Sequence, residues 1–151
     1  MNLTATQKVT VEDTFTGLLK CQHNLCYHIA QRLKPYDITR QQYEVLNILS
    51  ENFPGKLNIN AVKAKMNETM PDISRIANRL FEKGFIHRIK QEADKRNTEI
   101  ALTEKGIRVL QDVQPIINEE MGSHFENLSA DELLTLHQII YKVSENNPLK
   151  G

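Results

Sequence analysis

The sequence predicts a mainly α-helical fold with one small β-hairpin. In six segments, apolar residues recur at three- and four-residue spacing, which is the period of an amphipathic helix. Between the fourth and the fifth of these segments, two short runs of strand-like composition flank a polar turn. The chain has 151 residues, 40% of them hydrophobic and 25% charged, which is typical of a single globular domain.

Capping signals open the first two helices. Thr10 and Asp13 form a Thr-x-x-Asp start, in which the hydroxyl group caps free amides and the carboxylate is favoured at the positive end of the helix. We expect one long helix from there until Pro35 stops it. Thr39 and Gln42 form a second capping box, and the helix that it begins closes at a Pro-Gly pair.

The next two helices have the connection length of a helix-turn-helix. The first is short and covers about residues 61–66. Thr69 and Asp72 begin the second, which we expect over residues 70–83 before it stops at Gly84. Its apolar stripe consists of Ile73, Ile76, Ala77, Leu80 and Phe81. This stripe must face the core, so the opposite side of the helix is left to solvent or to a partner.

A hairpin and two more helices complete the predicted order. Residues 85–91 and 98–102 are the expected strands of the hairpin. Thr103 caps a fifth long helix, which Pro115 should kink or break. Ser129 starts the sixth helix with a Ser-x-x-Glu capping box.

Charge is distributed unevenly along the chain, although the formal net charge is zero. Residues 63–108 contain eleven Lys and Arg against seven Asp and Glu, a net charge of +4, and the remainder carries −4. A neutral chain can therefore present a local basic face. By itself, this modest asymmetry favours a nucleic-acid partner only slightly.

Polar side chains lie on or beside the outer face of the helix predicted over residues 70–83. At about 100° per residue, Ser74, Arg75 and Asn78 fall on its N-terminal half, away from the apolar stripe. Arginine can bond guanine in a bidentate manner, asparagine can do so with adenine, and serine suits either base. The pattern is that of major-groove readout of duplex DNA. For the helix alone, a solvated amphipathic face is an equal alternative.

The hairpin that follows is basic. Arg88 and Lys90 precede its turn, and its tip is Asp94-Lys95-Arg96. A two-stranded wing can reach the neighbouring minor groove, where an arginine is attracted to the negative potential. We expect Asp94 to orient an arginine by pairing with it. A charged tip that only keeps the hairpin solvated is the alternative.

At these residues the sequence resembles the MarR family of winged helix-turn-helix transcription regulators. Residues 72–88 (DISRIANRLFEKGFIHR) look like the family's recognition helix and first wing strand. The Asp94-Lys95-Arg96 tip and residues 102–106 (LTEKG) follow at the family's spacing, and residues 38–46 (ITRQQYEVL) resemble its second helix. The similarity covers nearly the whole chain. Lys63, where a small apolar residue is usual, and Asn67, where a glycine is common, depart from the pattern.

The resemblance implies a role in DNA binding for several side chains. Those expected at the major groove are Pro71, Asp72, Ser74, Arg75 and Asn78. Those expected at phosphates are Arg40, Arg79 and Lys83, and those expected to act from the wing are Lys90, Asp94, Lys95 and Arg96. Arg88 is expected to brace the wing rather than to contact DNA.

The resemblance also implies a homodimer. Residues 1–36 and 103–151 would form the dimerisation helices, and residues 37–102 the winged helix-turn-helix lobe, all within one continuous domain. A closed two-fold pair would bury apolar surface on the first, fifth and sixth helices that the central lobe cannot cover. Its two recognition helices would meet half-sites about 34 Å apart, so the expected operator is a near-palindrome.

The sequence does not decide whether a small molecule, a thiol or a metal ion controls such a regulator. Many relatives bind a small aromatic anion, and Tyr27, Tyr36 and Tyr43 could border such an effector pocket, although spaced aromatics are more often core. Cys21 and Cys26 differ by 140° around one helix and cannot pair within it, and a buried, unreactive cysteine is a commoner case than a redox-sensing thiol. A zinc site built on His23 and Cys26 would need further ligands. We therefore expect no cofactor and no metal.

Other function classes have less support. A winged-helix module for protein–protein contacts is the first alternative, but it should lack the basic wing tip. No catalytic pairing, phosphate-binding glycine loop or HExxH motif is present, so we do not expect an enzyme. The N-terminus lacks the features of a signal peptide and no run of about 18 apolar residues occurs, so the expected location is the cytoplasm, with no membrane partner.

Overall fold

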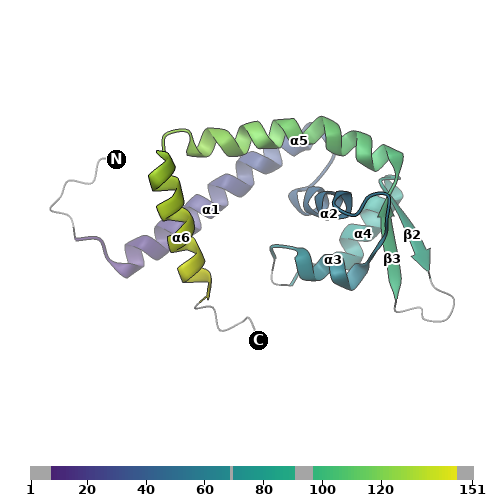
Figure 1. The fold of residues 1–151 in the computed structure, drawn as a ribbon, viewed down its shortest axis with the longest axis horizontal. Helices are drawn as coiled ribbons and strands as arrows, with labels where there is room; N and C mark the ends of the chain where they lie inside the picture. Colours follow the sequence, from purple (N-terminus) through teal and green to yellow (C-terminus); the bar gives the residue numbers. More distant parts are fainter. Residues whose placement is uncertain (1–7, 69, 91–96, 146–151) are drawn as a thin grey trace.

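The computed structural model describes residues 8–68, 70–90 and 97–145, and its secondary structure is mainly helical (Figure 1). The helices are α1 (Val11–Leu33), the 3-10 turn η1 (Lys34–Tyr36), α2 (Arg40–Ser50), α3 (Ile59–Lys65), α4 (Ile73–Glu82), α5 (Glu104–Phe125) and α6 (Ala130–Glu145). The strands are β1 (Leu57–Asn58), β2 (Ile86–Lys90) and β3 (Thr98–Leu102). The predicted order of helices around one hairpin is confirmed.

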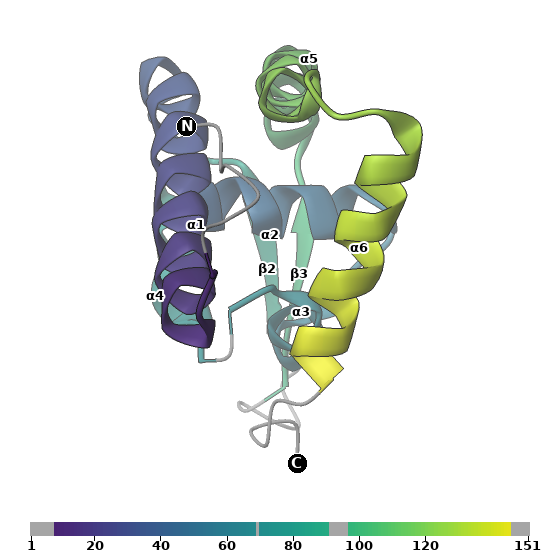
Figure 2. The same cartoon turned by 90° about the vertical axis from the view of Figure 1, so that its left-hand side faces the viewer.

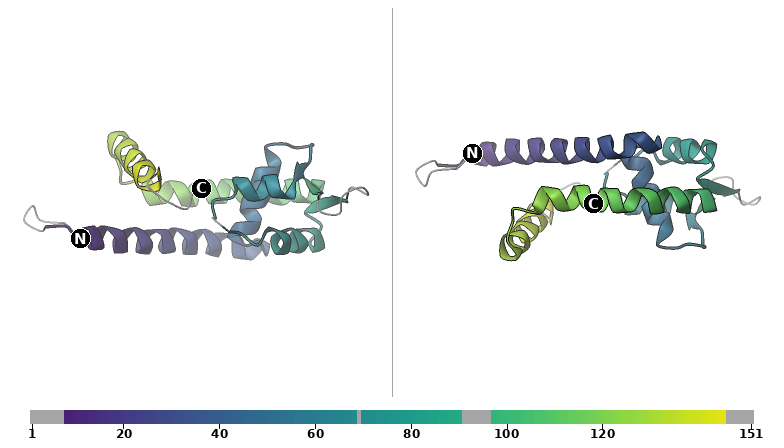
Figure 3. Two further views of the ribbon diagram at one scale, coloured as in Figure 1. Left: turned by 90° about the horizontal axis from the view of Figure 1, so that it is seen from below. Right: turned by 90° about the horizontal axis from the view of Figure 1, so that it is seen from above.

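The molecule has a compact lobe at one end and helical arms that extend from it. Helices α2, α3 and α4 and the sheet form the lobe, while α1 and α5 run alongside each other away from it (Figures 1 and 3). Helix α6 turns away from the far end of α5 and lies apart from α1 (Figure 2). Within the described residues, no helix is both long enough and apolar enough to cross a lipid bilayer.

The small sheet has three antiparallel strands in the order β1-β3-β2. Leu57 of β1 pairs with Ile100 of β3, and on the other side of β3 Ile100 pairs with Arg88 of β2. Strand β1 was not predicted, because two residues are too few to show the alternation that marks a strand. It lies directly before α3 and so attaches the helix-turn-helix to the wing.

One hydrophobic core joins the lobe to the arms. Its fully buried side chains come from the last turn of α1, from α2, α3 and α4, from β2 and β3, and from the first two thirds of α5. They include Leu33, Leu46, Val62, Leu80, Ile86, Ile100, Val113 and Ile117. Of the predicted α4 stripe, Ile73, Ile76, Ala77 and Leu80 are buried as expected, but Phe81 is 49% exposed. At about 100° per residue it falls at the edge of the stripe.

Pro115 does not break α5, which continues for a further ten residues to Phe125. A proline inside a helix removes one backbone hydrogen bond, a loss that packing on both sides can offset. Val113 and Ile117 are each 1% exposed, and Glu119 pairs with Arg32 of α1 at 2.9 Å. Packing on both sides of Pro115, together with the contact to α1, therefore stabilises α5 beyond the proline.

The ends of the arms are poorly covered. Every residue of α1 from Val11 to Asn24 is exposed, and no residue described in α6 is buried. Large apolar side chains in these segments include Phe15, Leu19, Leu133, Leu134, Ile139, Ile140 and Val143.

Candidate nucleic-acid interface

Helix α4 is fixed by its buried face and by both of its ends. The side chain of Asp72 caps it by accepting a hydrogen bond from the backbone N–H of Arg75 at 3.1 Å. At the other end Gly84 takes a φ of +75°, a conformation that favours glycine, and lets the chain turn into β2. With Ile76 and Leu80 buried beneath it, the helix presents a fixed outer face.

Five of the side chains predicted on this surface are exposed. They are Asp72, Ser74, Arg75, Asn78 and Arg79. Pro71 differs from the prediction in two ways: it precedes the helix, which begins at Ile73, and its side chain is buried. Because Asp72 is the N-cap, Pro71 lies outside the first turn, and we correct its expected place among the groove-facing side chains.

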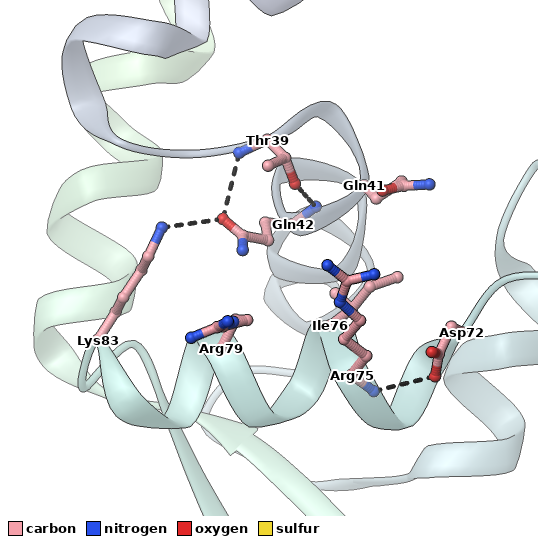
Figure 4. A pocket seen from close by; sticks show the side chains of 8 residues that line it. All are labelled: Thr39, Gln41, Gln42, Asp72, Arg75, Ile76, Arg79 and Lys83. Carbon is pink, nitrogen blue, oxygen red and sulfur yellow. Dashed lines mark hydrogen bonds between the residues drawn. The ribbon is translucent and has the colours of Figure 1, made fainter.

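A cavity of about 460 Å³ separates the N-terminal end of α2 from α4 (Figure 4). Its lining is Thr39, Gln41, Gln42, Asp72, Arg75, Ile76, Arg79 and Lys83. Three basic residues, at intervals of four, follow one edge of α4 along this cavity. The N-terminus of α2 faces them and adds the partial positive charge of its free amides. The groove is therefore electropositive and can hold phosphate oxygens.

The basic side chains predicted at phosphates differ in how firmly the chain holds them. Arg79 pairs with Glu82 at 3.1 Å, but both side chains are about 60% exposed, so solvent screens the pair and a phosphate can replace it. Arg40 pairs with Glu68 at 3.0 Å in a part-buried position. Lys83 binds Asp37 and Gln42. Arg79 is thus the residue of the three that is freest to bind a phosphate.

The turn of the helix-turn-helix is held to α2 by two carboxylates. Glu44 accepts the backbone N–H of Asn67 at 2.5 Å, and Glu68 accepts hydrogen bonds from Arg40 and from Gln41. The sequence analysis missed Glu44 and Glu68, because these contacts join residues 23 to 28 positions apart and leave no local pattern.

Arg88 joins the wing to the recognition helix α4. Its guanidinium donates a hydrogen bond to the side-chain oxygen of Asn78 and lies 5.3 Å from the centre of the Phe81 ring. This contact links β2 to α4, and the bracing role expected for Arg88 remains a prediction. Lys90 lies at the end of β2, while Asp94, Lys95 and Arg96 fall outside the described residues, so their expected roles remain predictions.

The structure has a cavity between α1 and α5, but none of the three tyrosines proposed for an effector pocket lines it. That cavity, of about 230 Å³, is lined by Leu25, Cys26, Ile29, Arg40, Met121, His124 and Phe125. Tyr27 is 55% exposed, and Tyr36 and Tyr43 pack against the core. Partial burial raises the pKa of the Tyr43 phenol, as it does for any acid that must ionise away from water.

The candidate thiol and metal residues form no larger cluster. Cys21 and Cys26 are both free thiols on α1. Among the residues that the structure describes, no group of three or more His, Cys, Asp and Glu side chains could hold a metal ion. His28 and His124 do approach Glu120, which Arg32 also contacts.

Comparison with known families and structures agrees with this geometry. The family model for the transcriptional regulator SarA/Rot matches residues 28–113, which run from the last third of α1 into α5 and include the whole lobe.

Solved structures share the fold over most of the chain. The S. aureus MepR–DNA complex has a TM-score of 0.78 at 24% identity, covering 93% of this chain and 100% of that one. A mutant of E. coli MarR complexed with operator DNA has a TM-score of 0.71 at 23% identity, covering 89% and 99%. A MarR-like transcription regulator from Bacillus cereus has a TM-score of 0.78 at 19% identity, covering 89% and 95%. The predicted resemblance to MarR regulators is confirmed.

Proposed function

The chain belongs to the transcriptional regulator SarA/Rot family, and from this premise we propose that it binds duplex DNA sequence-specifically, as a homodimer. The observation that carries the proposal is the outer face of α4: it is polar and exposed, while its opposite face is buried in the lobe. A rigid helix with such a face has the dimensions and the donors that the major groove accepts. Two of the structural neighbours, MepR and MarR, are described in complex with DNA.

In this proposal each side chain has a distinct task. Asp72 at the N-cap, and Ser74, Arg75 and Asn78 in the first two turns of α4, address base edges, and Arg79 binds phosphate beside the electropositive groove. Lys90, Asp94, Lys95 and Arg96 act from the wing at the adjacent minor groove. Contacts to bases select the sequence, whereas contacts to phosphates set affinity and register.

The homodimer is supported by what the arms leave exposed. Leu133, Ile140 and Val143 share one face of α6, yet the described part of this helix contains no buried residue. A helix with an apolar face gains most of its stability from packing, so a second copy that covers this face stabilises both. We accordingly assign residues 1–36 and 103–151 to dimerisation and residues 37–102 to DNA binding. Repression of transcription in the cytoplasm is the mode of action we propose.

The test is a salt-controlled titration of selected duplexes with Arg75→Ala and Arg96→Ala. We expect each variant to lose about 1–3 kcal/mol of operator binding free energy, and Arg75→Ala also to lose base discrimination at one position of each half-site. Arg108→Ala on α5 removes the same charge from an exposed site away from the groove and should bind like the parent. If both test variants also bind like the parent, the residue assignment is wrong. A parent chain that binds all duplexes equally would instead favour a protein–protein module.

A further inference from the structure

Lys83 links α4 to the connection before α2, to α2 itself and to the start of α5. It is the C-cap residue of α4, and its ammonium group reaches across to the connection between α1 and α2. It donates one hydrogen bond to the backbone carbonyl oxygen of Asp37 in that connection and another to the side-chain oxygen of Gln42 in the first turn of α2, the latter at 3.2 Å. The Lys83 side chain is 25% exposed, so most of its surface is already covered.

Both acceptors of the Lys83 hydrogen bonds are themselves fixed. Gln42 is 6% exposed, and its side-chain oxygen also accepts the backbone N–H of Thr39 as part of the capping box of α2. Asp37 has a φ of +54°, which directs the chain from η1 into α2. The carboxylate of Asp37 also lies 3.3 Å from the ammonium group, but it is 93% exposed and adds little. The carbonyl group and the buried amide therefore dominate the contact.

The backbone on the other side of Lys83 is bound to α5. The ammonium group of Lys105 donates to the carbonyl oxygen of Lys83 at 2.9 Å, and the hydroxyl group of Thr103 donates to that of Gly84 at 2.7 Å. Residues 83 and 84 are consequently held between the connection that leads from α1 through η1 into α2 and the start of α5. Helix α1, which this connection follows, and helix α5 are the two that extend from the lobe into the arms (Figure 1).

We infer that Lys83 is a positioning residue, which sets the direction of α4 relative to the dimerisation arms, rather than a phosphate ligand. This inference rests on the proposed function. Helix α4 spans ten residues, or about 15 Å, so a small rotation at its C-terminal end displaces the base-reading residues at its other end. Two such helices must match half-sites about 34 Å apart, and a loosely held helix cannot keep that spacing. Two of the three donors of the ammonium group are bound to the Asp37 carbonyl group and to Gln42, so a phosphate would have to displace the Asp37 carboxylate, 3.3 Å away, to reach the third.

Salt dependence separates the two roles. A lysine that neutralises a phosphate releases a counterion when the DNA binds. Removing such a lysine therefore makes the negative slope of log K against log salt shallower by about 0.9. A positioning residue releases none. Arg79 is the matched control, because it lies one turn earlier on the same edge of α4 and its pair with Glu82 is exposed.

The experiment compares Lys83→Met with Arg79→Met in the full chain. Methionine keeps most of the apolar stem of each side chain and removes the charge. For Lys83→Met we expect operator affinity to fall about tenfold with an unchanged salt slope, and we expect less discrimination between operators whose half-site spacing differs by one base pair. For Arg79→Met we expect the negative salt slope to become shallower by about 0.9, while the discrimination between half-site spacings is retained. A salt slope that becomes shallower in Lys83→Met, or an operator affinity equal to that of the parent, overturns the inference.

A second measurement needs no DNA. Spin labels are placed at Gln31→Cys on α1 and Glu82→Cys on α4, with Cys21 and Cys26 replaced by serine and unlabelled chain added in excess, so that the distance within one chain is measured. We expect a narrow distance distribution in the parent and a distribution at least about twice as wide in Lys83→Met, because side-chain contacts fix the junction. Equal widths overturn the inference. If the parent binds no duplex selectively while the widths still differ, the proposed function fails and the positioning role of Lys83 stands.

Discussion

Arg88 of β2 donates a hydrogen bond to the side-chain oxygen of Asn78 on α4 and stacks over Phe81 of the same helix. The wing and the recognition helix are therefore joined by one guanidinium group. Asn78 keeps its amide N–H donors for other partners, since Arg88 engages only its oxygen. A base contact by Asn78 would thus be oriented from the wing.

Replacing Arg88 should disturb the wing and the reading of bases together. We expect Arg88→Met to lose about 1–2 kcal/mol of unfolding free energy, because the hydrogen bond and the contact between the cation and the ring are both removed. Chemical denaturation of the protein measures this loss. Operator titration should also show weaker discrimination at the position that Asn78 reads.

Arg88→Lys is the useful companion to that variant. It keeps the charge but cannot offer the planar donor group, so it should recover only part of the loss. Full recovery by lysine would mean that charge alone matters and that the link to Asn78 does not orient the side chain.

The capping boxes and the core stripe of α4 were predictable because they are local. Thr10 with Asp13, and Thr39 with Gln42, form the hydrogen bonds that their spacing indicates. The contacts that orient α4 were not predictable. Lys83 meets Gln42 across 41 positions, and no periodicity connects such residues. Pro71 was misplaced because its ring suits the first turn of a helix, yet the side chain of Asp72 starts the helix one position after it.

Gly106 should not tolerate a side chain. A Cβ atom there would lie 2.2 Å from the carbonyl oxygen of Phe85, which is part of the backbone and cannot move aside cheaply. We expect Gly106→Ala to lower the free energy of unfolding by about 1–3 kcal/mol, although alanine favours helices. Thermal or chemical unfolding checks this, with Arg108→Ala as an exposed control on the same helix. A more stable Gly106→Ala variant would contradict the close packing of α5 on the turn after α4.

The apolar face of α6 should hold the dimer together. Ile140→Glu places a charge in the surface that we expect to be buried between two copies, and it should weaken dimerisation on the order of a hundredfold. Gln138→Glu adds the same charge roughly 200° away around the helix and should leave the dimer intact. Sedimentation over a range of concentrations distinguishes the two. Equal dissociation of both variants would place the dimer contact elsewhere.

The first turn of α1 should respond to acid. Hydrogen bonds from the side chain and the backbone of Thr10 hold the pKa of Asp13 below its ordinary value of 3.8. A lowered pKa in the folded state means that the carboxylate stabilises the helix start above pH 3.8, and that this stabilisation is lost as the pH falls through the lowered value. Backbone chemical shifts of residues 11–14 should report fraying in that range. Asp13→Asn should abolish this pH dependence and Glu12→Gln should not, while a midpoint above 3.8 would contradict the capping contact.

Selection of bound sites from random duplexes tests most directly whether two α4 helices read DNA as a pair. We expect the parent dimer to enrich one near-palindromic consensus, with half-site centres about 10–10.5 base pairs apart or at a multiple of that spacing. Recovery of an unselected pool, or of a single half-site with no symmetric partner, would contradict the proposed arrangement.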